Sequence, residues 1–114
     1  MSFSIVIPLY NKQKSIVKTI QSVLMQTYPH YEIIIVDDGS TDNSVNQVKK
    51  LTDSRIRLIQ KHNAGVSSAR NRGIQEAKYE YIALLDGDDV WDEHYLEEQV
   101  KLIHDFPDAK MWGV

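Results

Sequence analysis

The sequence contains no cysteine, only three prolines and five glycines, and no long apolar segment among its 114 residues. Without cysteine the chain has neither disulfide bonds nor thiol chemistry, which fits a reducing compartment. The opening segment MSFSIVIPLYN has no basic region before its apolar residues, and Pro8 and Asn11 interrupt it. We therefore expect neither a signal peptide nor a membrane span in this chain, and we expect a cytoplasmic protein.

An excess of positive charge is also absent. Lys and Arg number 13 against 16 Asp and Glu, which gives a formal net charge of −3. A nucleic-acid-binding domain usually has a basic balance, so nucleic acid is not expected as the main partner. Linkers, low-complexity segments and repeats are not seen either. The length suits one domain, residues 1–114, with its own core.

Short apolar runs rich in β-branched residues alternate with segments of helical periodicity. The runs are FSIVIPL (3–9), YEIIIVDD (31–38), RIRLIQ (55–60) and YIALLD (81–86), and AKMWGV (109–114) resembles the start of a fifth. The helical segments are 12–27, 41–52, 65–78 and 92–105. Continuous apolar runs are typical of strands buried on both faces. The pattern predicts an α/β fold, with an open, mostly parallel sheet and helices on both faces.

Polar residues gather where the predicted strands end. They are Tyr10 and Asn11 after the first strand, Asp37 to Ser40 after the second, Lys61 to Asn63 after the third, and the acids from Asp86 onward after the fourth. In open α/β sheets ligands bind outside the carboxyl ends of the strands. The sequence therefore predicts one ligand site at this edge of the sheet.

The acids of YIALLDGDDVWDE form the densest of these clusters. Crowded carboxylates raise one another's pKa unless a cation or hydrogen-bond donors compensate. Asp86 and Asp88 flank Gly87 on a turn, so both can face one point, and oxygen ligands suit Mg²⁺ or Mn²⁺. A turn with a helix cap is the alternative for these acids, and we assign that role to Asp92 and Glu93.

Two other strand ends carry candidates for binding a nucleotide. A carboxylate at Asp38 can accept from a nucleobase N–H or a ribose hydroxyl, whereas a turn-forming role is as plausible for Asp37. Tyr10 either offers a ring face for stacking a base or packs in the core. Asn11 is a candidate cap of the helix that starts near Lys12.

The segment HNAGVSSARNRG opens the third predicted helix. Free N–H groups at Gly65 to Ser67 would form an anion site at the positive helix end, and Arg70 lies one turn further on, where it can reach a phosphate. Arg72 is expected on a solvated face. The four histidines show no metal-ligand spacing and are expected at the surface.

These motifs together resemble family 2 of the glycosyltransferases, which have the A-type glycosyltransferase fold. The resemblance rests on SIVIPLYNK, SVLMQTYPHYEIIIVDDGSTD, NAGVSSARNRGI and YIALLDGDD, in this order. It implies a nucleotide-diphosphate sugar as donor, often UDP-linked, and Mn²⁺ or Mg²⁺ as cofactor.

The resemblance also implies a role for each matching residue. Pro8 and Tyr10 would border the base, with Tyr10 stacked on it, and Asp38 would accept the base N–H. Arg70 would lie in the nucleotide pocket. The acids Asp86 and Asp88 would contact the ribose or a metal-bound water and bind the metal on the diphosphate, respectively.

The resemblance also implies a mechanism that inverts the configuration of the sugar. In such a mechanism, a carboxylate base deprotonates the acceptor hydroxyl. That base is expected beyond Val114, so residues 1–114 resemble the donor-binding half of a larger transferase. The acceptor would be a saccharide or a lipid-linked saccharide, which allows peripheral attachment of the parent enzyme to the inner face of a membrane. Transfer by the isolated chain is not expected.

Other interpretations remain open at this point. A response-regulator receiver would account for IIIVDDG and for Asp86 as phosphoacceptor, but it would begin near Tyr31 and needs a Lys at a later strand end. A sugar-phosphate nucleotidyltransferase should have a glycine-rich basic loop after the first strand, where PLYNKQKS has no glycine. A non-catalytic nucleotide-binding fragment is the third alternative.

Overall fold

The computed structural model describes residues 1–105 and, by their backbone, 111–113. Its strands are β1 (Phe3–Leu9), β2 (Tyr31–Asp37), β3 (Ile56–Gln60), β4 (Tyr81–Leu84) and β5 (Met111–Gly113). Its helices are α1 (Ile16–Leu24), α2 (Ser44–Lys49), α3 (Val66–Glu76) and α4 (Tyr95–Asp105). The predicted alternation of strands and helices is confirmed. Of the predicted fifth strand, residues 109, 110 and 114 lie outside the described residues.

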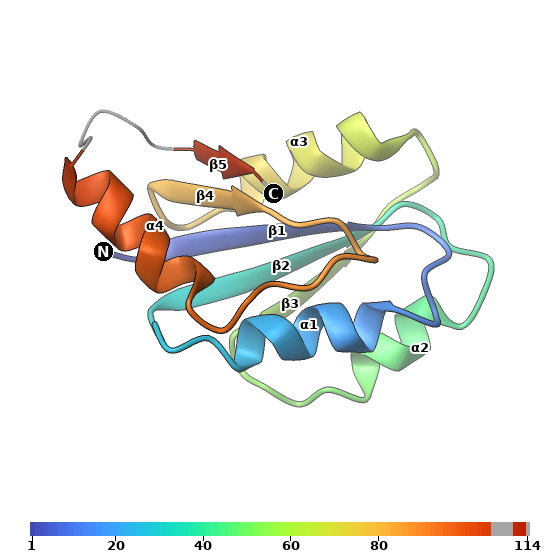
Figure 1. The fold of residues 1–114 in the computed structure, drawn as a ribbon. Coiled ribbons are helices and arrows are strands. Elements are labelled where there is room, and N and C mark those ends of the chain that lie inside the picture. Colours follow the sequence, from blue (N-terminus) through green and yellow to red (C-terminus); the bar gives the residue numbers. More distant parts are fainter. Residues whose placement is uncertain (106–110, 114) are drawn as a thin grey trace.

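The strands form one sheet in the order β3-β2-β1-β4-β5, and every neighbouring pair is parallel. Their carboxyl ends therefore meet at one edge of the sheet (Figure 1). All residues of β1 and β2 are buried, which explains their uninterrupted apolar sequences. Strand β3 lies at the edge of the sheet and is only partly buried.

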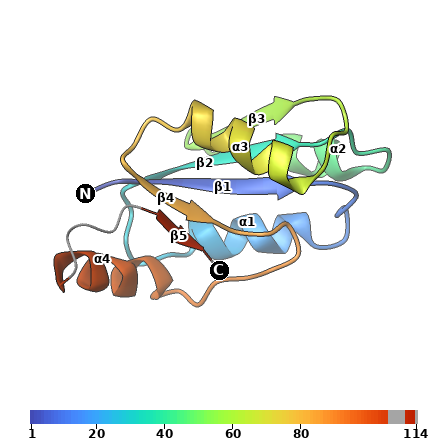
Figure 2. The same cartoon turned by 90° about the horizontal axis from the view of Figure 1, so that it is seen from above.

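Helices cover both faces of the sheet, as predicted, but unequally. On one face, alternate residues of β1 and β2 pack against residues of α1, α2 and α4, among them Ile16, Ile20, Val48, Leu96 and Ile103. On the other face, Ile34 and Val36 pack against Ala69 of α3. Figure 2 shows α1 and α4 on one side of β1 and α3 on the other. In the part of the chain that the structure describes, no helix combines the length and apolar character needed to cross a membrane.

Strands β1 and β4 separate before β1 ends. The pairing of β1 with β2 continues to Leu9, whereas its pairing with β4 stops at Val6. Pro8, which has no N–H to donate, lies beyond the paired part of β4 and leaves no ladder bond broken on that side. The order of the strands along the chain also reverses between β1 and β4, and in open α/β sheets such a position is where a ligand crevice forms.

Helices α1, α2 and α4 begin three or four residues later than the sequence predicted, at Ile16, Ser44 and Tyr95. The loops before α1 and α2 are joined by Asn11, which has a left-handed backbone with φ 50°. Its Oδ1 accepts hydrogen bonds from the N–H groups of Thr41 at 2.8 Å and Asp42 at 3.3 Å. Asn11 therefore links two loops at the end of the sheet, and the prediction that it caps the adjacent helix is wrong.

Candidate functional site

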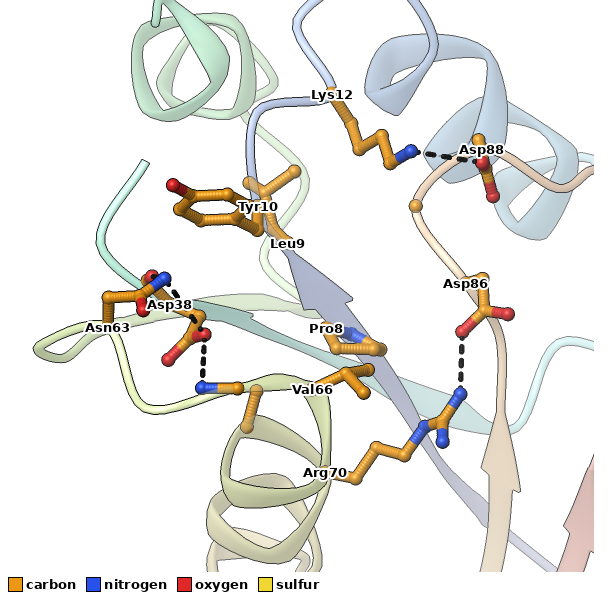
Figure 3. Close-up of a pocket in the computed structure, with 13 residues that line it drawn as sticks. Pro8, Leu9, Tyr10, Lys12, Asp38, Asn63, Val66, Arg70, Asp86 and Asp88 are labelled. Carbon is orange, nitrogen blue, oxygen red and sulfur yellow. Dashed lines mark hydrogen bonds and ion pairs between the residues drawn. The ribbon is translucent and has the colours of Figure 1, made fainter. Parts of the chain in front are cut away.

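A cleft of about 610 Å³ opens at the carboxyl ends of the strands, where β1 and β4 separate (Figure 3). The residues that line it are Pro8, Leu9, Tyr10, Lys12, Asp38, Asn63, Gly65, Val66, Ala69, Arg70, Asp86, Gly87 and Asp88. The structure thus brings together every residue that the sequence predicted for nucleotide or metal binding. They come from the ends of β1, β2 and β4 and from the first turns of α3.

The two sides of the cleft differ in chemistry. Tyr10, Asp38 and Asn63 lie on one side, and Asp86 and Asp88 lie on the other (Figure 3). The Tyr10 residue is 46% exposed, which contradicts a role in core packing and leaves ring surface available for stacking. One side of the cleft therefore combines an aromatic ring with polar groups, and the other is acidic.

Asp38 is buried and holds the loop between β3 and α3. Its Oδ1 accepts hydrogen bonds from Lys61 Nζ and Ala64 N, both at 2.9 Å. Its Oδ2 accepts one from Gly65 N at 2.9 Å and a longer one from Asn63 Nδ2 at 3.4 Å. Burial raises the pKa of Asp38, but the bonds from Lys61 and from the two backbone N–H groups outweigh it, and the pKa lies below its usual value.

One N–H group of the predicted anion site, that of Gly65, is therefore already bonded to the Asp38 side chain. The Gly65 N–H at the start of α3, expected to be free, is donated to the Asp38 carboxylate. A carboxylate accepts about four hydrogen bonds in all. Three short bonds and one long one already reach Asp38, so a ligand N–H would have to replace the weak Asn63 contact on Oδ2.

Each acid on the other side of the cleft is paired with a base of the chain itself. Arg70 Nη2 lies 3.0 Å from Asp86 Oδ1, and Lys12 Nζ lies 3.1 Å from Asp88 Oδ2 (Figure 3). These two cations supply the compensation that crowded carboxylates require. Arg70 Nε is buried and has no hydrogen-bond partner among the residues that the structure describes.

The turn that carries the acids fits closely against the end of β1. A Cβ on the buried Gly87 would lie 3.3 Å from the Pro8 carbonyl oxygen and 3.5 Å from Lys12 Cγ, so a side chain would crowd the contact. Ser15 Oγ donates to the Gly87 carbonyl oxygen at 2.9 Å. The segment between β1 and α1 thus contacts the acidic turn twice, through the hydrogen bond from Ser15 to Gly87 and through the ion pair of Lys12 with Asp88.

The chemistry of the acids fits a divalent cation that shares its coordination with a ligand. Within residues 1–105 and 111–113, no group of three or more His, Asp or Glu could hold a metal ion by itself. Mg²⁺ is typically bound by one or two carboxylates together with phosphate oxygens and water. Asp86 and Asp88 provide such a pair.

Asp37, for which a turn-forming role was one alternative, and Asp92, assigned to a turn or cap, both accept backbone N–H groups, whereas the Glu93 carboxylate lies 3.5 Å from His94 Nε2. Ser40 N donates to the Asp37 carboxylate at 3.3 Å, and His94 N donates to Asp92 Oδ2 at 2.9 Å. Arg72 is exposed and lies 3.7 Å from Glu76 on the same helix. All four histidines are exposed.

Sequence reasoning missed Lys12 as a residue of the cleft and Ser15 as a residue that supports it. Lys12 lies just after the first strand, as Tyr10 does, but the sequence pattern placed it at the start of the predicted helix 12–27. Only the strand order, which places β4 beside β1, shows that its ammonium group faces Asp88.

The fold and the cleft define an open parallel α/β domain with a ligand site at the strand ends. The family model described as Glycosyl transferase family 2 matches residues 4–112, and the chain belongs to this family. The receiver interpretation is therefore excluded. Among curated relatives, the chain is 43% identical over 97 residues to the glycosyltransferase GlyG of Streptococcus pneumoniae, an alignment that covers 82% of this chain and 32% of GlyG.

A second relative is the UDP-Glc:alpha-D-GlcNAc-diphosphoundecaprenol beta-1,3-glucosyltransferase WfgD of Escherichia coli, 41% identical over 101 residues, with 88% of this chain and 40% of WfgD covered. Among solved structures, S. aureus TarS 1-349 in complex with UDP-GlcNAc superposes with a TM-score of 0.86 at 29% identity, over 92% of this chain and 32% of that one.

A mannosyltransferase from Pyrobaculum calidifontis in complex with GDP-Man and Mn²⁺ superposes with a TM-score of 0.83 at 25% identity. That superposition covers 89% of this chain and 32% of the mannosyltransferase. The chain therefore spans well under half the length of these similar proteins.

Proposed function

We propose that residues 1–114 form the donor-binding part of an inverting glycosyltransferase that uses a nucleotide-diphosphate sugar, in the first place a UDP-sugar. The observation that carries the proposal is the division of the cleft, with an exposed aromatic ring on one side and paired acids and bases on the other. A nucleotide-diphosphate sugar has the matching division, with a flat base at one end and a charged diphosphate further along.

On the base side, Tyr10 stacks on the nucleobase, and Pro8 borders it. Asp38 accepts the base N–H through Oδ2, the oxygen whose contact with Asn63 is long at 3.4 Å. Because the other bonds to Asp38 hold the loop before α3, the same carboxylate fixes the shape of this side of the cleft before a ligand binds.

On the diphosphate side, Asp88 would hold a divalent cation, Mn²⁺ or Mg²⁺, and Asp86 would contact the ribose or a water of the cation. When bound, the cation would supply Lewis-acid stabilisation of the negative charge on the departing diphosphate. Arg70 orients Asp86 and adds positive charge next to the phosphates.

The complete reaction needs residues beyond this chain. The base that deprotonates the acceptor hydroxyl belongs to the acceptor-binding part, and the acceptor is a saccharide or lipid-linked saccharide in the cytoplasm. UDP-GlcNAc in TarS, GDP-Man with Mn²⁺ in the Pyrobaculum mannosyltransferase and the UDP-Glc donor in the name of WfgD support this class of donor.

Titration of UDP into the chain, with and without Mn²⁺, tests the proposal by isothermal calorimetry. We expect Mn²⁺ to strengthen UDP binding to the unmodified chain and to have little effect on Asp88→Ala. Asp89→Ala is the matched control, because Asp89 is exposed and lies outside the cleft lining. If neither Mn²⁺ nor the Asp88→Ala substitution changes the affinity for UDP, the non-catalytic nucleotide-binding alternative is favoured.

A further inference from the structure

Among the charged residues that line the cleft, Lys12 is the one for which neither the family resemblance nor the proposed function provides a role. Its Nζ donates to Asp88 Oδ2 at 3.1 Å, across the mouth of the cleft. The side chains of Lys12 and Asp88 are 43% and 51% exposed, respectively. An ion pair this exposed is weakly held, because water screens both charges.

The backbone of Lys12, in contrast, is fixed. Its N–H donates to Ser44 Oγ at 2.9 Å, and its carbonyl oxygen accepts from Ser15 N and Ile16 N at 3.1 and 2.9 Å. The ammonium group therefore lies at the end of a flexible side chain, whereas the backbone of Lys12 is held in place by these hydrogen bonds. Lysine has a compact charge with rotatable donors, so its Nζ can change partners without movement of the backbone.

Arg70, on the other acid, is less free to change its partner, although the side chains of Arg70 and Asp86 are only slightly less exposed, at 37% and 43%. The difference is that Arg70 Nε is buried in the wall of the cleft, which limits the movement of the guanidinium away from Asp86. Of the two acids, Asp88 is thus the one that can exchange its protein cation for another.

We propose that Lys12 is an exchangeable counter-ion of Asp88: it neutralises Asp88 while no divalent cation is bound, and it transfers to a diphosphate oxygen when Asp88 binds the cation. This inference rests on the proposed donor site. It makes Lys12 a donor-binding residue. In the ligand-free state, its ion pair with Asp88 opposes the binding of a cation before the nucleotide arrives.

The exchange couples the two ligands of the cleft. A divalent cation alone must displace Lys12 from Asp88 and leave the ammonium group without a partner. A diphosphate that arrives with the cation provides that partner, so Lys12 opposes the cation alone and favours the cation together with a nucleotide. Nucleotide without metal can recruit Lys12 only by taking it from Asp88.

The test measures Mn²⁺ binding in the absence of nucleotide, by the electron paramagnetic resonance signal of free Mn²⁺, and UDP binding at saturating Mn²⁺, by calorimetry. We expect Lys12→Met to bind Mn²⁺ about two- to five-fold more tightly, the range that corresponds to losing one exposed ion pair. At saturating Mn²⁺, where Asp88 has released Lys12, the same variant should bind UDP more weakly, by about the same factor.

Two variants control for general effects. Lys12→Arg keeps the charge and should resemble the unmodified chain in both measurements. Lys14→Met removes one exposed charge from the same segment, outside the cleft lining, and should change neither.

The outcomes separate this inference from the proposed function. If the unmodified chain binds UDP in a Mn²⁺-dependent manner but Lys12→Met binds Mn²⁺ no more tightly, the exchange is wrong and the donor site stands. Tighter Mn²⁺ binding with unchanged UDP affinity at saturating Mn²⁺ also overturns it, because Lys12 then never reaches the diphosphate. An unmodified chain that binds neither Mn²⁺ nor UDP overturns both.

Discussion

Two aspartates of the cleft are each paired with a lysine, yet their surroundings give the pairs different functions. The side chains of Asp38 and Lys61 are only 4% and 16% exposed, whereas those of Asp88 and Lys12 are half-exposed. Removal of one partner from a buried pair leaves an uncompensated charge in a poorly solvated place, which is costly. An exposed pair loses little when it separates. Asp38 is thus a structural anchor, whereas Asp88 has the exposure that the proposed exchange of its cation requires.

At the residue scale, Asp38→Asn should lower the free energy of unfolding by about 2–3 kcal/mol, since Lys61 loses its charged partner and two backbone N–H groups lose a strong acceptor. Urea denaturation at pH 7 measures the change. Asp89→Asn, at an exposed position, should stay within about 0.5 kcal/mol of the unmodified chain. Equal stability of the two variants would contradict the anchoring role.

The same residue gives a prediction on pH. Because the folded chain holds the pKa of Asp38 below the ordinary value, Asp38 stabilises the folded state above that value, and the contribution is lost as the pH falls through the lower pKa of the folded state. The difference in unfolding free energy between the unmodified chain and Asp38→Asn should therefore shrink as the pH is lowered through the range below the ordinary Asp pKa of about 3.9. Urea denaturation across this range measures it. A difference independent of pH would contradict the assignment.

At the scale of elements, the loops after β1 and β2 work as one unit. Asn11 joins them, with its left-handed backbone and its bonds to the N–H groups of Thr41 and Asp42. Tyr10 and Lys12, its two neighbours in the chain, both line the cleft. The position of the stacking ring and that of the ammonium group therefore depend on one amide side chain outside the cleft.

Substitution of Asn11 separates its two contributions. Asn11→Gly removes the side-chain bonds and should cost about 1 kcal/mol. Asn11→Ala removes them and also places a Cβ at φ 50°, so it should cost more, by up to about 1 kcal/mol. Urea denaturation compares the two, and UDP calorimetry should show weaker binding for both. Greater stability of the alanine variant would contradict this account.

Gly73 allows helix α3 to pack directly against Val6 of β1. A Cβ at this position would come within 2.3 Å of Val6 Cγ1. Gly73→Ala should push α3 away from β1 and cost about 1–3 kcal/mol in unfolding free energy. Because Val66 and Arg70 of this helix line the cleft, UDP affinity should fall as well. Ser67→Ala, at an exposed position of the same helix, is the control, and similar results for the two would be contrary to this explanation.

For the whole molecule, the sequence predicted the fold well because β1 and β2 are buried on both faces and read as uninterrupted apolar runs. It also predicted which residues share the cleft, since all strands are parallel and their ends meet at one edge. The order of the strands in the sheet could not be predicted from periodicity. The pairing of Lys12 with Asp88 depends on β4 lying beside β1, so it could not be predicted either. The role of Asn11 was missed for the same reason, because its partners come from a distant loop.

The last prediction concerns the molecule as a whole, because any ligand that binds only the folded chain raises its stability. At a UDP concentration about 100 times its Kd, with Mn²⁺ present, the gain is about 2.7 kcal/mol, which corresponds to a rise in Tm on the order of 10 °C. GDP with Mn²⁺ should give a smaller rise at the same concentration. Differential scanning fluorimetry measures both.

The comparison of the two nucleotides decides the donor base, because both carry the same diphosphate and differ only at the side of the cleft formed by Tyr10 and Asp38. A larger rise with GDP would mean that this side accepts a purine, and the donor would then resemble the GDP-Man of the Pyrobaculum enzyme. Tyr10→Ala should reduce the rise for either nucleotide, since stacking on the ring is worth about 1–3 kcal/mol for any base. An unchanged rise in Tyr10→Ala would place the base elsewhere in the cleft.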